Sequence, residues 1–196
     1  MQCCELRGFF GLGYVALATS SGASAGVYGR RDGKVSRDEA LLHVRAIVDA
    51  VDLPVSADLE KGFGDTPEDA ALTIRLGAEA GLVGGSIEDA TGDKDKPLYD
   101  IAHAVERIGA AVEAKRKLPF AFMLTARTEN FLRGNPDLDN TIRRLQAFEK
   151  AGADVLMRSG LPRKKFSVRA VRMKAKGSLR LASTAAPIRS IACAMS

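Results

Sequence analysis

The chain of 196 residues is poor in cysteine, has no tryptophan and contains no long apolar run. Its three cysteines, Cys3, Cys4 and Cys193, lie near the two ends, which excludes the disulfide framework typical of small secreted domains. No apolar stretch approaches the ~18 residues that a membrane-spanning helix needs. The N-terminal segment contains the acidic Glu5 and does not resemble a signal peptide, so the sequence predicts a cytoplasmic protein.

Acidic residues are missing from one part of the chain. Residues 158–196 carry 10 Lys and Arg and no Asp or Glu, whereas residues 1–157 carry 19 basic and 24 acidic residues. The net charge of +5 therefore belongs to the end of the chain. We expect a folded domain over residues 1–162 and a basic tail over residues 163–196. Contact of this tail with nucleic acid or another anionic surface stays an alternative function, although its one aromatic residue, Phe166, completes no recognition motif.

Short apolar runs alternate with helical patterns along the middle of the chain. Strands are expected at residues 14–20, 54–59, 82–87, 120–126 and 153–157. Ser36 and Glu39 form a capping-box pattern at the start of one helix, and Thr66 followed by Pro67 marks the start of another. Such alternation predicts parallel strands joined by crossover helices.

Two α/β architectures share this alternation, the doubly wound sheet and the (β/α)₈ barrel. A doubly wound nucleotide-binding sheet usually carries a glycine-rich phosphate loop, and neither GxGxxG nor GxxxxGK[ST] occurs in the chain. The pitch of roughly 30 residues per unit matches a barrel of about 250 residues. The sequence therefore predicts an α/β fold of the (β/α)₈ TIM-barrel type that is incomplete, with about five or six of the eight units.

Acidic side chains follow two neighbouring predicted strands. Asp58 and Glu60 are two residues apart, so on a strand they would point to the same side, and Glu88 ends the next strand. These carboxylates would repel one another unless a cation lay between them, and a hard ion such as Mg²⁺ fits that place. The alternative is that each is a solvated acid or pairs with a lysine. Arg127 ends a later strand, either to bind a substrate anion or to form a structural ion pair with Glu129 or Glu88.

The motifs around these residues resemble the isocitrate lyase/phosphoenolpyruvate mutase superfamily. The resemblance is closest to its bacterial isocitrate lyase/PEP mutase family proteins and covers roughly residues 11–162. It is carried by ATSSGASAG, GRRDGKVSRDE, ADLEKGFGD, GGSIEDATGD and LTARTENF, in this order and spacing. The resemblance implies a (β/α)₈ barrel, a homo-oligomer and small 2-oxo or hydroxy carboxylate or phosphonate substrates. No membrane partner is expected from the short apolar runs, and a nucleic-acid partner is not favoured by the composition of the tail.

A divalent-metal site is part of what the resemblance implies. Asp58 would bind Mg²⁺ (or Mn²⁺) directly, while Glu60, Glu88 and Asp32 would hold the water molecules of the ion. The implied activity is that of a metal-dependent lyase or mutase, which cleaves a C–C or P–C bond and leaves a metal-stabilised enolate.

The resemblance also implies the substrate contacts. Ser21, Gly22 and Ala23 would donate hydrogen bonds to the substrate carboxylate and oxo group, and Arg127 would bind the anionic end. Arg127 and Asp32 are the residues for which it implies a catalytic role.

The chain departs from the family pattern in its loop and its ends. Lyase members carry a cysteine in the loop after the Glu88 strand, but this loop reads ATGDKDKPLYD, which favours an oxaloacetate- or phosphonopyruvate-like substrate. There is no room for the first barrel strand before Gly11, and the alternating pattern stops after Pro162. We interpret both ends as products of truncation or frame disruption of a longer gene, so a catalytically inactive fragment stays an alternative.

Overall fold

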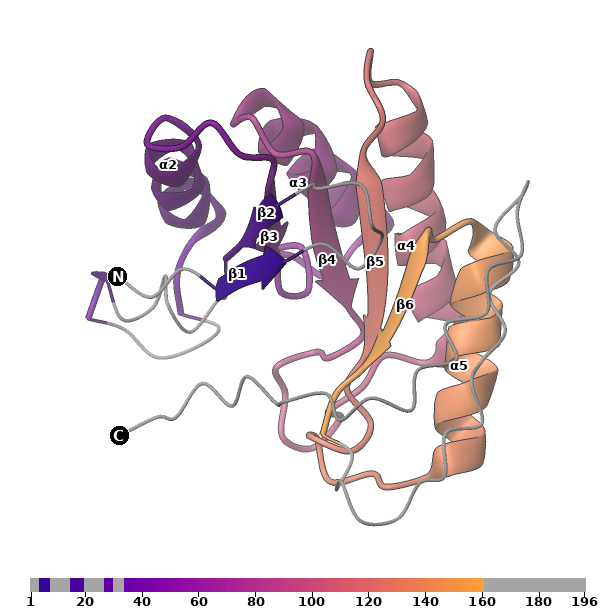
Figure 1. The fold of residues 1–196 in the computed structure, drawn as a ribbon. Helices are drawn as coiled ribbons and strands as arrows, with labels where there is room; N and C mark the ends of the chain where they lie inside the picture. Colours follow the sequence, from indigo (N-terminus) through magenta and orange to yellow (C-terminus); the bar gives the residue numbers. More distant parts are fainter. Residues whose placement is uncertain (1–3, 8–14, 20–26, 30–33, 161–196) are drawn as a thin grey trace. The chain divides into compact units, whose positions relative to one another are not determined.

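The computed structural model describes residues 4–7, 15–19, 27–29 and 34–160, and these build a sheet with helices along one face (Figure 1). The strands are β1 (Cys4–Arg7), β2 (Val15–Ala18), β3 (Val55–Asp58), β4 (Gly84–Glu88), β5 (Met123–Thr128) and β6 (Val155–Arg158). The helices are α2 (Arg37–Val48), α3 (Pro67–Glu79), α4 (Ile101–Arg116) and α5 (Leu138–Ala151). Among the described residues, no helix combines the length and apolar character needed to cross a membrane.

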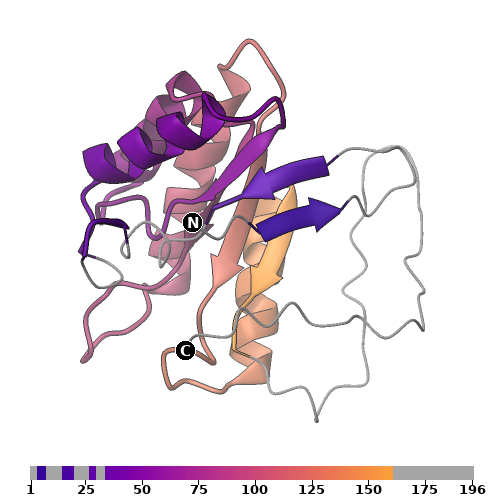
Figure 2. The same ribbon diagram turned by 60° about the vertical axis from the view of Figure 1, so that its left-hand side comes forward.

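The order of the strands in the sheet follows their order in the chain. Strands β2 to β6 are parallel neighbours, joined in the sequence β2-β3-β4-β5-β6. Helix α3 packs against α2 and α4, and α4 packs against α5, so the helices form one continuous row (Figures 1 and 2). A doubly wound sheet reverses its strand order at a switch point and covers both faces with helices. The observed order confirms the α/β fold of the TIM-barrel type, and the described residues hold five of the eight parallel strands of such a barrel.

Strand β1 was not predicted from the sequence. Cys4–Arg7 precedes Gly11 and pairs with β2. The pairing is antiparallel, with Cys4 opposite Ala18 and Arg7 opposite Val15, so β1 is not the missing parallel strand of a barrel. The segment CELR lies outside the regular alternation of strands and helices from which the other strands were predicted.

The predicted helix starts are confirmed at both capping boxes. The Ser36 side chain accepts from the backbone N–H of Glu39, and the Glu39 carboxylate accepts from the Ser36 N–H at 2.9 Å. Thr66 and Asp69 form the same reciprocal pair before α3, with Pro67 in the first turn. These caps satisfy N–H groups that have no partner inside the helix, and they fix where each crossover helix begins.

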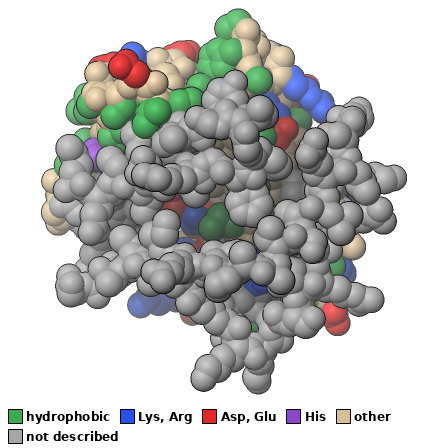
Figure 3. Space-filling model, in the orientation of Figure 1, with side chains coloured by type: hydrophobic (Ala, Val, Ile, Leu, Met, Phe, Trp, Pro, Cys, Tyr) green, Lys and Arg blue, Asp and Glu red, His purple; other side chains and the backbone are tan. Residues whose placement is uncertain are grey.

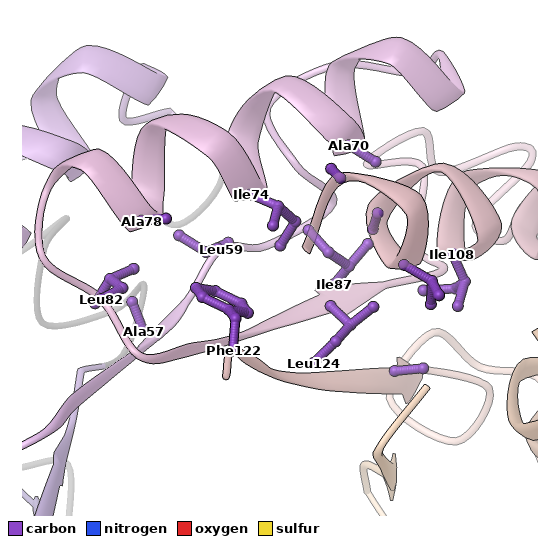
Figure 4. Packing of buried hydrophobic residues seen from close by; sticks show 14 of the residues in the cluster. Ala57, Leu59, Ala70, Ile74, Ala78, Leu82, Ile87, Ile108, Phe122 and Leu124 are labelled. Atoms are coloured by element: carbon purple, nitrogen blue, oxygen red, sulfur yellow. The ribbon is translucent and has the colours of Figure 1, made fainter. Parts of the chain in front are cut away.

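The two faces of the parallel sheet differ in chemistry. Residues facing the helices are apolar and pack against α3 and α4, as Leu59, Ile87 and Leu124 do around Ile74 and Ile108 (Figure 4). The opposite face carries the alternate residues of each strand and is polar near the carboxyl ends: it includes Ser56, Asp58, Ser86, Glu88, Thr125 and Arg127. The alternation of the strands therefore separates the apolar core from the polar face on which the site is built.

Asp69 links the cap of α3 to the start of α2. Its Oδ2 accepts from the Thr66 hydroxyl at 2.8 Å, and its Oδ1 accepts from Arg37 at 3.2 Å. The hydrogen bonds from Thr66, followed by the contact with Arg37, lower the pKa of Asp69 below its usual value. Because the pKa is lower in the folded state, this contribution to stability is present at neutral pH and is lost as the pH falls through the folded-state pKa.

We predict that Asp69→Ala lowers the free energy of unfolding by about 1–2 kcal/mol at pH 7, the usual cost of losing a helix cap. The difference from the wild type should be smaller at pH 3 than at pH 7, because the contribution of Asp69 declines as the pH falls toward and through its lowered folded-state pKa. Urea unfolding followed by circular dichroism at both pH values measures it. Glu68→Ala, an exposed neighbour in the same turn, is the control; a gap for Asp69→Ala that is equally large at pH 3 would contradict this account.

Candidate active site

A cavity of about 790 Å³ lies beside the carboxyl ends of β3, β4 and β5. Acidic and basic side chains both line it, among them Glu60, Lys61, Glu88, Arg127, Glu129 and Arg133. Side chains of both charges are visible near the centre of the face shown in Figure 3. The carboxyl ends of the strands carry the functional groups in barrels of this type, so this cavity is the candidate site.

Arg127 is the centre of the site. Its Nη1 donates to Asp58 Oδ2 at 2.8 Å, its Nε lies 2.9 Å from Glu129 Oε1, and its Nη2 contacts Glu88 Oε2. Arg127 and Glu88 are paired in the register of β4 and β5, so the sheet itself brings these two side chains together. Three of the residues predicted from the sequence, Asp58, Glu88 and Arg127, therefore converge. Glu129, considered there only as an ion-pair partner of Arg127, joins the cluster.

The two-residue spacing of Asp58 and Glu60 predicted that both lie on one strand, but Glu60 lies beyond the end of β3. Strand β3 ends at Asp58, and Glu60 adopts a left-handed backbone conformation with φ of 50°. Its N–H donates to Asp58 Oδ1 at 3.0 Å, and its carbonyl accepts from the N–H of Glu88 at 2.9 Å. The two-residue spacing thus places Glu60 in a turn, and from there it lines the cavity.

Four predicted site residues lie outside the described part of the chain: Ser21, Gly22, Ala23 and Asp32. Within the described part, no three His, Cys, Asp or Glu side chains converge as a ready-made metal cluster. The guanidinium group of Arg127 contacts three of the carboxylates instead.

The oxygen donors of the site nevertheless fit a hard divalent ion. Glu88 Oε2 and Glu129 Oε1 are buried and contact Arg127, but neither accepts a hydrogen bond from the described residues. Asp58, Glu88 and Glu129 carry three negative charges, against two positive charges on Arg127 and Arg133. Mg²⁺ needs only one or two carboxylates and keeps several of its water molecules, so the donor set suits it without a closed cage.

Arg133 is a second guanidinium group at the cavity, and the sequence analysis missed it. Its Nη2 lies 3.4 Å from Glu88 Oε1, and its Nε lies 3.6 Å from Glu129 Oε2. Its side chain is 42% exposed, compared with 14% for Arg127. Arg127 is therefore held within the carboxylates, whereas Arg133 contacts them from the solvent-exposed side.

The loop after β3 is held from behind by a buried arginine of α4. Arg107 donates to the carbonyl groups of Lys61 and Gly64, the second at 2.8 Å, and its guanidinium carbon lies 4.4 Å from the centre of the Tyr99 ring. Burial lowers the pKa of Arg107 and raises that of Tyr99, whose hydroxyl group donates to Asp65. This support fixes the turn that carries Glu60.

Comparison with known proteins gives one family and several relatives. Residues 7–192 match the family model described as phosphoenolpyruvate phosphomutase. The chain is 36% identical over 152 residues to 2-methylisocitrate lyase of Escherichia coli (strain K12), covering 74% of this chain and 50% of that protein. It is 31% identical over 153 residues to 2,3-dimethylmalate lyase of Eubacterium barkeri, covering 74% and 51%. The chain thus spans about half the length of the curated relatives it matches.

Solved structures show the same relationship. A lyase- or mutase-like protein of Burkholderia cenocepacia J2315 is 58% identical, with a TM-score of 0.74, and the match covers 75% of this chain and 53% of that one. A phosphonopyruvate hydrolase in complex with oxalate and Mg²⁺ is 29% identical, with a TM-score of 0.68, covering 77% and 52%.

We predict that Arg127→Met lowers the free energy of unfolding by about 3 kcal/mol, because it leaves buried carboxylates without their shared cation. Glu129→Gln in the same protein should recover part of this loss, since one of the unpaired charges is removed. Urea unfolding of the single and double variants measures both effects. Arg116→Met, which removes an exposed partner of Glu113, is the control and should cost less than about 1 kcal/mol. If Arg127→Met lowers the free energy of unfolding no more than Arg116→Met does, Arg127 is not the cation that stabilises the buried carboxylates.

Proposed function

The chain belongs to the phosphoenolpyruvate phosphomutase family, and we propose that it is an enzyme that cleaves or rearranges a C–C or P–C bond of a small 2-oxo or hydroxy carboxylate. One observation carries the proposal: Asp58, Glu88 and Glu129 surround Arg127 at the carboxyl ends of three consecutive strands, beside a cavity. The relatives named as lyases and a hydrolase of such substrates support the same reaction class.

The proposed metal site uses the carboxylates of β3 and β4. Asp58 would bind Mg²⁺ (or Mn²⁺) directly, and Glu60, Glu88 and Asp32 would hold its water molecules. The ion would supply Lewis-acid polarisation of the 2-oxo and carboxylate oxygens of the substrate. The Mg²⁺ of the related phosphonopyruvate hydrolase structure supports a divalent ion of this kind.

The cationic side chains of the cavity suit a substrate with more than one negative charge. Arg127 would bind one anionic group of the substrate, and its guanidinium group would stabilise negative charge that develops there. Arg133 and Lys61 also line the cavity, nearer the solvent than Arg127. Ser21, Gly22 and Ala23 would donate to the carboxylate and oxo group at the other end.

An oxaloacetate- or phosphonopyruvate-like substrate is the finer part of the proposal. The loop after β4, residues 90–100, contains no cysteine, whereas the resemblance implies one for isocitrate-type lyases. Thr91 and Gly92 of this loop line the cavity. Relatives described as phosphonopyruvate hydrolase and oxaloacetate acetylhydrolase support this substrate class. We extend the proposal to a homo-oligomer, as the family resemblance implies, and to a location in the cytoplasm, as the sequence predicts.

We predict that the full chain converts oxaloacetate or phosphonopyruvate, that EDTA abolishes the activity and that added Mg²⁺ restores it. Asp58→Asn should lower kcat/KM by more than about 100-fold, beyond the usual effect of altering groups behind a metal ligand. Proton NMR distinguishes pyruvate from acetate as products, and a protein-free sample with Mg²⁺ corrects for spontaneous decarboxylation.

Asp95→Asn, in the exposed part of the loop after β4, is the control variant and should leave the rate unchanged. The proposal fails if a folded chain gives no turnover of either substrate above the protein-free rate. It also fails if turnover is the same with EDTA and with Mg²⁺.

A further inference from the structure

A closed ring of polar contacts joins five side chains, three from the ends of β4 and β5 and two from α5: Asp89, Thr128, Asn130, Asn140 and Arg144. The Thr128 Oγ1 lies 2.8 Å from Asp89 Oδ2 and 2.6 Å from Asn130 Oδ1. Asn130 Nδ2 donates to Asn140 Oδ1 at 2.9 Å, and Arg144 Nε donates to the same oxygen at 2.8 Å. Arg144 Nη1 closes the ring by donating to Asp89 Oδ2 at 3.2 Å.

The ring is attached to both glutamates that contact Arg127 from β4 and β5. Asp89 directly follows Glu88, and Asp89 Oδ1 accepts from the backbone N–H of Glu129 at 2.9 Å. Asp89, Thr128 and Glu129 are buried almost completely. Beyond the backbone pairing of β4 and β5, side chains that do not line the cavity therefore tie together the residues that follow the two strands.

The ring also closes the loop between β5 and α5. Asn130 lies at the start of this loop, and Asn140 lies in the first turn of α5, so the bond between them joins its two ends. Within the loop, the Asn135 N–H donates to the Asn130 carbonyl at 2.9 Å. Arg133, which contacts Glu88 and Glu129, lies between these two residues.

We infer that this ring is a positioning element of the site: it holds Glu129 and Arg133 at fixed places relative to Glu88, although all five of its members lie outside the cavity lining and none contacts Arg127 through its side chain. A buried polar network rigidifies the structure, and removing one member leaves its partners without a contact. The single hydroxyl proton of Thr128 is donated to Asp89 or to Asn130, one at a time. Opening the ring at Asn140 should therefore loosen the loop locally and leave the apolar core intact. The part of the inference that concerns ligands rests on the proposed function.

Asn140 is the best place to open the ring. It is half-buried in the first turn of α5, and its hydrogen-bond partners Asn130, Arg144 and Asp137 do not belong to the carboxylate cluster. Asn140→Ala removes the acceptor, whereas Asn140→Asp keeps an oxygen that accepts from both Asn130 and Arg144. Gln146→Ala, exposed on the same helix, is the matched control.

The first measurement is hydrogen–deuterium exchange of the full chain, read by mass spectrometry. We expect Asn140→Ala to raise exchange about tenfold in peptides covering residues 129–136, with no change in peptides from α3. Asn140→Asp and Gln146→Ala should match the wild type. Unchanged exchange in residues 129–136 for Asn140→Ala, or a rise that Asn140→Asp does not reverse, would overturn the inference.

The second measurement is the affinity for Mn²⁺ by electron paramagnetic resonance and for oxalate in the presence of Mn²⁺ by calorimetry. We expect Asn140→Ala to weaken binding about tenfold, as groups behind metal ligands do, and Asn140→Asp to restore it. Increased exchange with unchanged affinity would reduce the ring to a structural feature and overturn its positioning role. If the wild type binds neither probe, the proposed function fails, and the exchange experiment alone decides whether the ring holds the loop.

Discussion

The contact of one guanidinium group with three carboxylates is the constraint on which the site depends. Asp58, Glu88 and Glu129 come from three separate strand ends, and their charges would repel one another at this degree of burial without Arg127. Arg127 can reach all three only if β3, β4 and β5 are parallel neighbours with their carboxyl ends level. The strand order observed in the sheet meets this requirement, so the electrostatics of the site and the topology of the fold depend on each other.

Two buried arginines from the helices hold the acidic strand ends from behind. Arg107 of α4 donates to carbonyl groups in the loop after β3, and Arg144 of α5 binds Asp89 after β4. In each case the helix that supports a loop lies further along the chain than the loop itself. The row of helices along one face of the sheet therefore does more than cover apolar residues. It supplies cations and hydrogen-bond donors to the backbone and side chains beneath the cavity.

Local patterns predicted the elements of this fold, and long-range contacts were harder to foresee. The capping pair of Ser36 and Glu39 involves neighbours in the chain, and it was found from the sequence. The convergence of Asp58 and Arg127 followed from the position of each at a strand end. The left-handed turn at Glu60 was missed because a two-residue spacing places two side chains on one side only when both residues lie in the strand, and β3 ends at Asp58. The pairing of Asp89 with Arg144 spans 55 residues, and no local period connects such positions.

The charge arrangement also indicates where specificity resides under the proposed reaction. Loss of the terminal carboxylate of an oxaloacetate-like substrate and cleavage of the P–C bond of a phosphonopyruvate-like substrate both leave the same three-carbon fragment. Negative charge develops on the 2-oxo oxygen of that fragment in either reaction, so both reactions need the same cationic groups there. The departing groups differ in shape and charge. Discrimination between them therefore falls to residues nearer the solvent than Arg127, where Arg133 and the loop containing Thr91 line the cavity.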